Sequence, residues 1–195
     1  MRLLHSWILT NAVGFAAGFG LFLSISELII GNKNMTSAFL GHFIGLMVFG
    51  IILAFSQSLV LNRQNIKTLK WIVSGALGFT LVMLVIWPLY LTKIWPAEGP
   101  IEPLIISLVS CTFLGLMVYI FYRKDLAGTG YFLIMWIIGA IAGIVISALL
   151  MIFIISKLGL PFIAEMAVFT LITGAIAGLI SGGSIKRLIP HDPKH

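Results

Sequence analysis

Three ionisable side chains beside long apolar segments are the first residues of this chain whose types could do chemistry. They are Glu27, His42 and Glu165. Ionisable groups are costly in an apolar medium, so two carboxylates and an imidazole that converge there could bind a cation or carry a proton. Their spacing matches no metal motif, and no nucleophile stands beside a base, so we predict no catalytic residue, metal site or cofactor. The alternative is that all three face water at a membrane surface.

Asn11 and Gln57 form a second polar set, together with Ser56 and Ser58 beside the glutamine. Amide and hydroxyl groups at a similar depth can hydrogen-bond across neighbouring helices. In membrane proteins such bonds commonly hold helices together, each contributing about 1 kcal/mol or less. We predict this role for Asn11 and Gln57. The alternative is that they line a substrate pocket.

Six uncharged stretches of at least twenty residues must position these side chains, and each is long enough to cross a bilayer. Hydrophobic residues make up 60% of the chain and charged residues 9%, against about 25% charged residues in a soluble domain. This composition excludes a soluble protein. It predicts an all-α integral membrane protein, a bundle of six transmembrane helices in a single domain over residues 1–195. The stretches are 3–26, 34–62, 71–92, 103–122, 126–156 and 166–185.

The net charge of +6 arises from basic residues that are dispersed among the predicted connections. This dispersal does not indicate a nucleic-acid partner, which would need a basic face; it predicts contact with membrane lipids. Nine of the twelve basic residues fall on the side that also holds the two termini. The positive-inside rule therefore places both termini in the cytoplasm. The nine are Arg2, Arg63, Lys67, Lys70, Arg123, Lys124, Lys186, Arg187 and Lys194.

Three Trp-Ile pairs, each with a glycine seven residues after the tryptophan, indicate an internal repeat. They are Trp7 with Gly14, Trp71 with Gly78 and Trp136 with Gly143, so the tryptophan spacings are 64 and 65. A repeat of two spans predicts three helical hairpins, approximately 7–62, 71–123 and 131–187, around a pseudo-threefold axis along the membrane normal. The alternative is coincidence, since interfacial tryptophans and helical glycines are common in membrane proteins.

The second helices of the hairpins also match one another, with Gly45, Gly115 and Gly174 as the expected equivalents. In this alignment Ala127 and Lys186 replace Gln57 in the other two hairpins. Small residues four apart let membrane helices approach closely. We expect these strips to pack inside the bundle; a homodimer interface is the alternative. The strips are Gly14 with Gly18, Gly41 with Gly45, Gly139 with Gly143, and Gly174 with Gly178 and Gly182.

One segment of the chain resembles a known family. Its residues are Gly41, Gly45, Gly50, Gln57, Leu59-Val60-Leu61, Arg63, Trp71, Ser74 and Gly78. The pattern is similar to that of small multi-pass bacterial membrane proteins, frequent in cyanobacteria, with Trp/Gly-rich helical-hairpin repeats and no assigned activity. The resemblance covers residues 7–78 well and the last hairpin more loosely. It implies the fold and a location in a bacterial inner membrane, and it adds no function.

These observations predict a non-enzymatic structural or accessory membrane subunit, with lipids and other membrane subunits as its partners. The alternative is a small-solute transporter or the substrate-binding subunit of a transporter, because six helices in under 200 residues is also the size of such components. An intramembrane enzyme would need His42 to face Glu27 or Glu165, and it ranks last.

Overall fold

The part of the chain that the structure describes folds into six α-helices. The computed structural model describes residues 2–30, 35–92 and 101–190. The helical prediction is confirmed, because the described residues form a six-helix bundle. The helices are α1 Arg2–Ile30, α2 Met35–Leu61, α3 Thr68–Leu91, α4 Ile101–Tyr122, α5 Thr129–Phe153 and α6 Phe162–Ile185.

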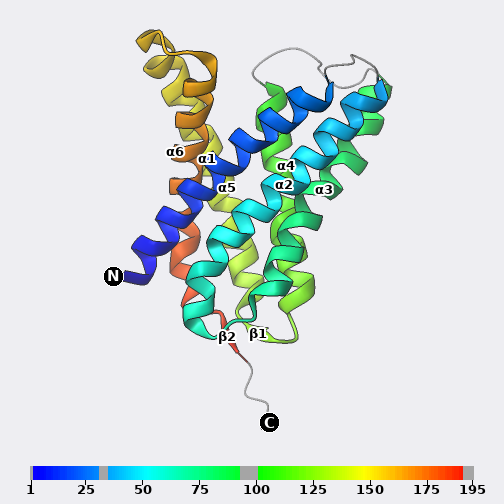
Figure 1. Ribbon diagram of the computed structural model, residues 1–195. Helices are drawn as coiled ribbons and strands as arrows, with labels where there is room; N and C mark the ends of the chain where they lie inside the picture. The colour runs from blue at the N-terminus through cyan, green and yellow to red at the C-terminus, as the bar shows by residue number, and fades with distance from the viewer. Residues whose placement is uncertain (1, 31–34, 93–100, 191–195) are drawn as a thin grey trace.

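The helices form a closed ring in which each packs against its neighbours in the sequence and α1 also packs against α6. Figure 1 shows the start of α1, the end of α6 and the α2–α3 and α4–α5 connections toward one end of the bundle. We call this the basic end, because eight described arginines and lysines lie there. All eight are exposed. They are Arg2, Arg63, Lys67, Lys70, Arg123, Lys124, Lys186 and Arg187.

Five of the helical segments are long and apolar enough to cross a membrane, and Leu108–Tyr122 of α4 is a shorter apolar segment. The outer surface carries large apolar side chains, among them Leu9, Leu84 and Leu179, each more than half exposed. The interior holds polar side chains, all uncharged in the described part of the chain. In soluble proteins, apolar side chains are mostly buried and polar ones mostly exposed. In lipid, burial of a leucine gives no comparable gain in free energy, because the surrounding acyl chains are equally apolar. The surface thus suits membrane insertion.

Two short connections close the basic end. After α2, a 3-10 turn η1 (Asn62–Gln64) ends at Asn65, whose positive φ of 56° is tolerated by asparagine. After α4, β1 (Leu126–Ala127) pairs antiparallel with β2 (Ile189–Pro190), which follows α6. Gly128 follows β1 with a φ of 77°, and a Cβ on it would collide with the carbonyl oxygen of Arg187. At the opposite end, the 3-10 turn η2 (Ile155–Leu158) lies between α5 and α6.

The glycine strips pack inside the bundle, as expected from the sequence. A Cβ on Gly18 would collide with Phe49 of α2, and one on Gly143 would lie 2.7 Å from the carbonyl oxygen of Thr173 in α6. Gly174 packs in the same way against the backbone of Asn11. Glycine thus supplies the close helix approach on which packing in lipid depends.

Candidate functional site

A chain of buried hydrogen bonds joins α1, α2 and α3 at the level of Asn11. The Asn11 amide donates to the carbonyl oxygen of Trp7, 2.8 Å away, and its Oδ1 accepts from Gln57 Nε2 at 2.8 Å. Gln57 Oε1 then accepts from the indole Nε1 of Trp71, also at 2.8 Å. All four residues are at most 1% exposed. We call Trp7, Asn11, Gln57 and Trp71 the polar chain.

The contacts of the polar chain are those predicted for bridging amides. Gln57 uses its amide nitrogen and its carbonyl oxygen on groups of the protein itself, and Asn11 does the same. Within the described residues, Ser110 Oγ is the one buried side-chain oxygen or nitrogen that has no partner. Each amide thus has one N–H and one oxygen lone pair engaged within the protein, and both side chains are buried.

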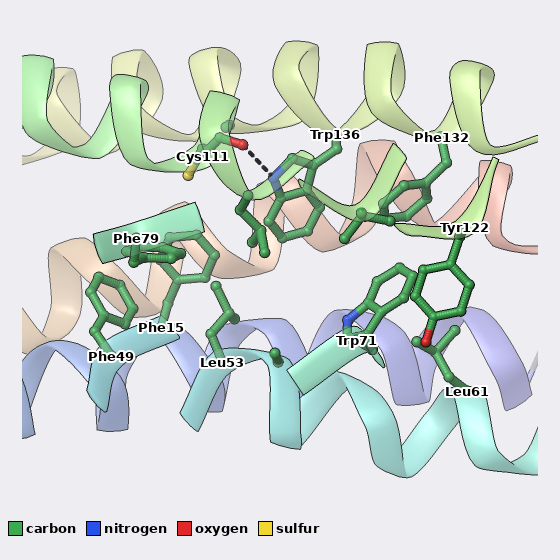
Figure 2. Close-up of a cluster of buried hydrophobic side chains, with 14 of the residues drawn as sticks. Phe15, Phe49, Leu53, Leu61, Trp71, Phe79, Cys111, Tyr122, Phe132 and Trp136 are labelled. Atoms are coloured by element: carbon green, nitrogen blue, oxygen red, sulfur yellow. Dashed lines mark hydrogen bonds between the residues drawn. The ribbon is translucent and has the colours of Figure 1, made fainter. Parts of the chain in front are cut away.

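Each of the three repeated tryptophans donates its indole N–H to a different helix. Trp7 on α1 donates to Ser181 Oγ of α6 at 3.0 Å, and Trp136 on α5 donates to the carbonyl oxygen of Cys111 in α4 at 3.1 Å. Figure 2 shows the second of these bonds. Trp71 on α3 donates to Gln57 of α2. A buried indole needs such an acceptor, and here each acceptor lies on the helix that precedes the tryptophan around the ring.

Aromatic rings fill the interior beside the polar chain. Trp7, Trp71 and Phe132 meet edge to face, with ring centroids 5.4 to 6.3 Å apart. Figure 2 shows Phe132 and Trp136 on one helix, above Trp71, and Phe15 near Phe49 and Phe79 toward the other end of the cluster. The bundle interior at this level is therefore packed with side chains.

Comparison with known proteins adds no assignment to this site. No family model, curated protein or solved structure matches the chain. The function is therefore inferred from the contacts of the chain itself.

Glu27, His42 and Glu165 do not form a metal-binding group, since the described residues contain no set of three metal-ligating side chains that could hold an ion. Glu27 is exposed, and Glu165 is half-buried in the first turn of α6, where a negative charge is favourable. His42 Nδ1 lies 2.8 Å from the carbonyl oxygen of Ala38 on its own helix, and its ring packs edge to face on Phe22. No ion pair links the three within the described part of the chain.

The tilt of α1 explains why Glu165 does not approach Glu27. Gly174, Gly178 and Gly182 of α6 contact the first half of α1, whose later part rests on α2 through Gly45 and Ser26. Figure 1 shows the end of α1 and the start of α6 far apart at the end opposite the basic end. Glu27 lies near the end of α1 and Glu165 in the first turn of α6, so the two carboxylates are held apart and do not form a shared site.

Sequence reasoning missed Ser181 and the cavity at the basic end. Ser181 is wholly buried and accepts from Trp7, but a serine beside a Gly-Gly pair gives no signal in the sequence that a distant indole will reach it. The cavity lies between the start of α1 and the end of α2, with Arg2 and Arg63 in its lining. In the sequence these arginines indicate only the orientation of the helices, because their proximity depends on how α1 and α2 pack.

Proposed function

We propose that this protein is a non-enzymatic structural or accessory subunit of a bacterial inner membrane. All six helices lie in lipid, the basic end faces the cytoplasm, and the protein acts through contacts with lipids and other membrane subunits. The observation that carries this proposal is the polar chain. Its amides bond to one another and to the backbone in an interior packed with aromatic rings, so they hold helices together.

The alternative of a solute carrier receives less support from the same contacts. A carrier needs polar groups turned toward a cavity, and small-molecule pockets usually enclose about 300–1,000 Å³. Asn11 and Gln57, the amides predicted at a suitable depth, bond to the protein itself. The aromatic rings that adjoin them occupy the space a substrate would need.

The proposed architecture is a threefold repeat of a helical hairpin. It is supported by the tryptophan bonds, which run from α1 to α6, from α3 to α2 and from α5 to α4. It is also supported by glycines: a Cβ on Gly182 would meet Leu4 and Trp7, and one on Gly115 would meet Leu133 and Trp136. In both places the neighbours are the tryptophan itself and the leucine three residues before it.

These contacts favour a different alignment from the one based on sequence. Gly115 and Gly182 share their surroundings, so we align the residues just before them, Leu114 and Ser181, with Gln57 in place of Ala127 and Lys186. The side chain of Leu114 has no hydrogen-bond acceptor. Trp136 donates instead to the backbone carbonyl oxygen of Cys111. The three interfaces thus differ in polarity within one proposed arrangement.

A ligand screen tests the function. The purified chain in a neutral detergent is heated with and without single amino acids, nucleobases, vitamins, sugars and metal ions while its tryptophan fluorescence is followed. We expect none of these solutes to raise the melting temperature, because the amides of the polar chain are buried and bonded to groups of the protein itself. A solute that raises it by several degrees, and does so less in Gln57→Leu, would establish a carrier site and overturn the proposal.

A further inference from the structure

A cavity of about 190 Å³ opens at the basic end between the first turns of α1 and the end of α2. Two of its lining residues are arginines, two are uncharged polar residues and two are apolar; none is acidic. The cavity therefore carries two positive charges. The lining residues are Arg2, Leu3, Ser6, Val60, Arg63 and Gln64.

We propose that this cavity binds a phosphate group, carried by the headgroup of an anionic phospholipid or by a free phosphate ion. The guanidinium group presents a fixed fork of N–H donors that matches the oxygens of phosphate. Arg2 reaches the cavity from α1 and Arg63 from η1, so an anion between them is approached from two sides. The Ser6 hydroxyl and the Gln64 amide supply further donors.

The charges of Arg2 and Arg63 are available to a ligand. In the described part of the chain neither forms an ion pair, whereas Lys70 at the same end pairs with Asp125. The structure describes the side chains of two glutamates, Glu27 and Glu165. Both lie at the end of the bundle opposite the basic end. Two unpaired guanidinium groups that share one cavity repel each other, and a bound phosphate removes that repulsion.

The size and the walls of the cavity restrict the ligand. Its 190 Å³ is smaller than the roughly 300–1,000 Å³ of pockets that enclose drug-sized molecules, so it suits a headgroup more than a whole metabolite. Leu3 and Val60 provide an apolar wall beside the two arginines. A phospholipid matches both features, because its phosphate is joined to acyl chains that would continue along the apolar helix surface.

This inference rests on the proposed membrane insertion, with the basic end at the level of the lipid headgroups. Basic residues at that level attract anionic lipid in general. The cavity adds a defined site to this general attraction, and the experiment must separate the two. A matched pair serves as the control: Arg123 and Lys124 are exposed at the same end and lie outside the cavity.

The test measures thermal unfolding of the full chain in neutral detergent with added dioleoylphosphatidylglycerol or dioleoylphosphatidylcholine, and separately with inorganic phosphate or chloride at equal ionic strength. We expect phosphatidylglycerol, and not phosphatidylcholine, to raise the melting temperature of the wild type. The double variant Arg2→Gln/Arg63→Gln should need at least about tenfold more phosphatidylglycerol for the same rise. Arg123→Gln/Lys124→Gln should respond like the wild type.

Comparison of the two probes identifies the source of the phosphate. A rise with phosphatidylglycerol alone identifies a lipid site, and an equal rise with inorganic phosphate identifies a site for the free ion. In either case Arg2→Gln/Arg63→Gln must need at least about tenfold more of the probe for the same rise. A second variant, Ser6→Leu, fills the cavity without a change of charge and should also lose the response. If the arginine variant and Ser6→Leu both respond like the wild type, or if neither probe stabilises the wild type, the proposal is wrong.

Failure here would leave the proposed function intact. The ligand screen uses detergent without anionic lipid or phosphate and reports on the polar chain, which lies deeper in the bundle than the cavity. If the protein binds neither phosphate nor any of the screened solutes, the proposal of a structural subunit still stands. A protein whose polar chain binds a solute fails the functional proposal, whatever happens at the cavity.

Discussion

At the scale of single residues, the buried polar groups explain how helices associate without a hydrophobic driving force. Gln57 is the central member of the polar chain, because it accepts from Trp71 and donates to Asn11. Its removal leaves two buried groups without partners. A buried group that loses its partner costs about 1–3 kcal/mol, although hydrogen bonds between membrane helices average less.

The first prediction concerns Gln57→Leu. We expect this variant to lose about 1–2 kcal/mol of unfolding free energy, because the Trp71 indole and the Asn11 carbonyl lose their shared partner. Unfolding by sodium dodecyl sulfate, followed by tryptophan fluorescence, measures the loss.

Thr112→Val is the control for Gln57→Leu. Thr112 is exposed and its hydroxyl donates only to Leu108 on its own helix, so its removal should change stability by less than about 0.5 kcal/mol. Equal stability of Gln57→Leu and Thr112→Val would show that the polar chain does not hold the helices together.

At the scale of helices, close backbone approach at glycine decides how neighbouring elements pack. A Cβ on Gly78 would lie 2.5 Å from the Cα and 2.7 Å from the nitrogen of Leu114, both backbone atoms of α4. Backbone cannot turn aside as a flexible side chain can, so α3 and α4 would have to separate. Gly50 and Gly75 meet in the same way between α2 and α3.

The second prediction follows from this contact. Gly78→Ala should destabilise the bundle by about 1–3 kcal/mol, the usual cost of overpacking. Gly20→Ala is the matched change, because Gly20 is also helical but a Cβ on it would meet nothing within 4 Å. It should be neutral or stabilising, since alanine favours helix over glycine. A melting temperature for Gly78→Ala at or above that of Gly20→Ala contradicts the packing argument.

At the scale of the whole molecule, the exposed basic residues and the proposed membrane together set an orientation. Eight exposed arginines and lysines gather at the basic end, whereas Lys157 in η2 belongs to the opposite end. The single cysteine of the chain, Cys111, is 1% exposed, so the wild type offers almost no reactive thiol. This is a favourable background for labelling from either side of a membrane.

The third prediction is the outcome of that labelling. In intact bacterial cells, a membrane-impermeant maleimide should label Lys157→Cys and not Lys124→Cys, because the positive-inside rule predicts that the basic end lies in the cytoplasm. Permeabilised cells should give both signals, and the wild type should give neither. Labelling of Lys124→Cys in intact cells would reverse the orientation. Labelling of both positions there would mean that the two ends of the bundle are not on opposite sides of a membrane.

The sequence by itself determined the helices and their apolar character. A long run without charge can satisfy its peptide groups in lipid only by forming a helix, and this argument needs no knowledge of neighbours. The bridging role of Asn11 and Gln57 was also predictable, because amide side chains at a similar depth in neighbouring apolar helices form hydrogen bonds with each other. Glycine strips likewise indicated close packing, since their effect depends only on the missing side chain.

The tertiary structure decided which groups meet. Helix tilt is set by packing along the whole length of a pair, so the sequence could not show that α1 leaves α6 and keeps Glu165 away from Glu27. Register between helices likewise depends on contacts distant in the chain, such as Trp7 with Ser181, which are 174 residues apart. The same packing brings Arg2 and Arg63 to one cavity. Local pattern specifies the elements, and the angles between them specify the sites.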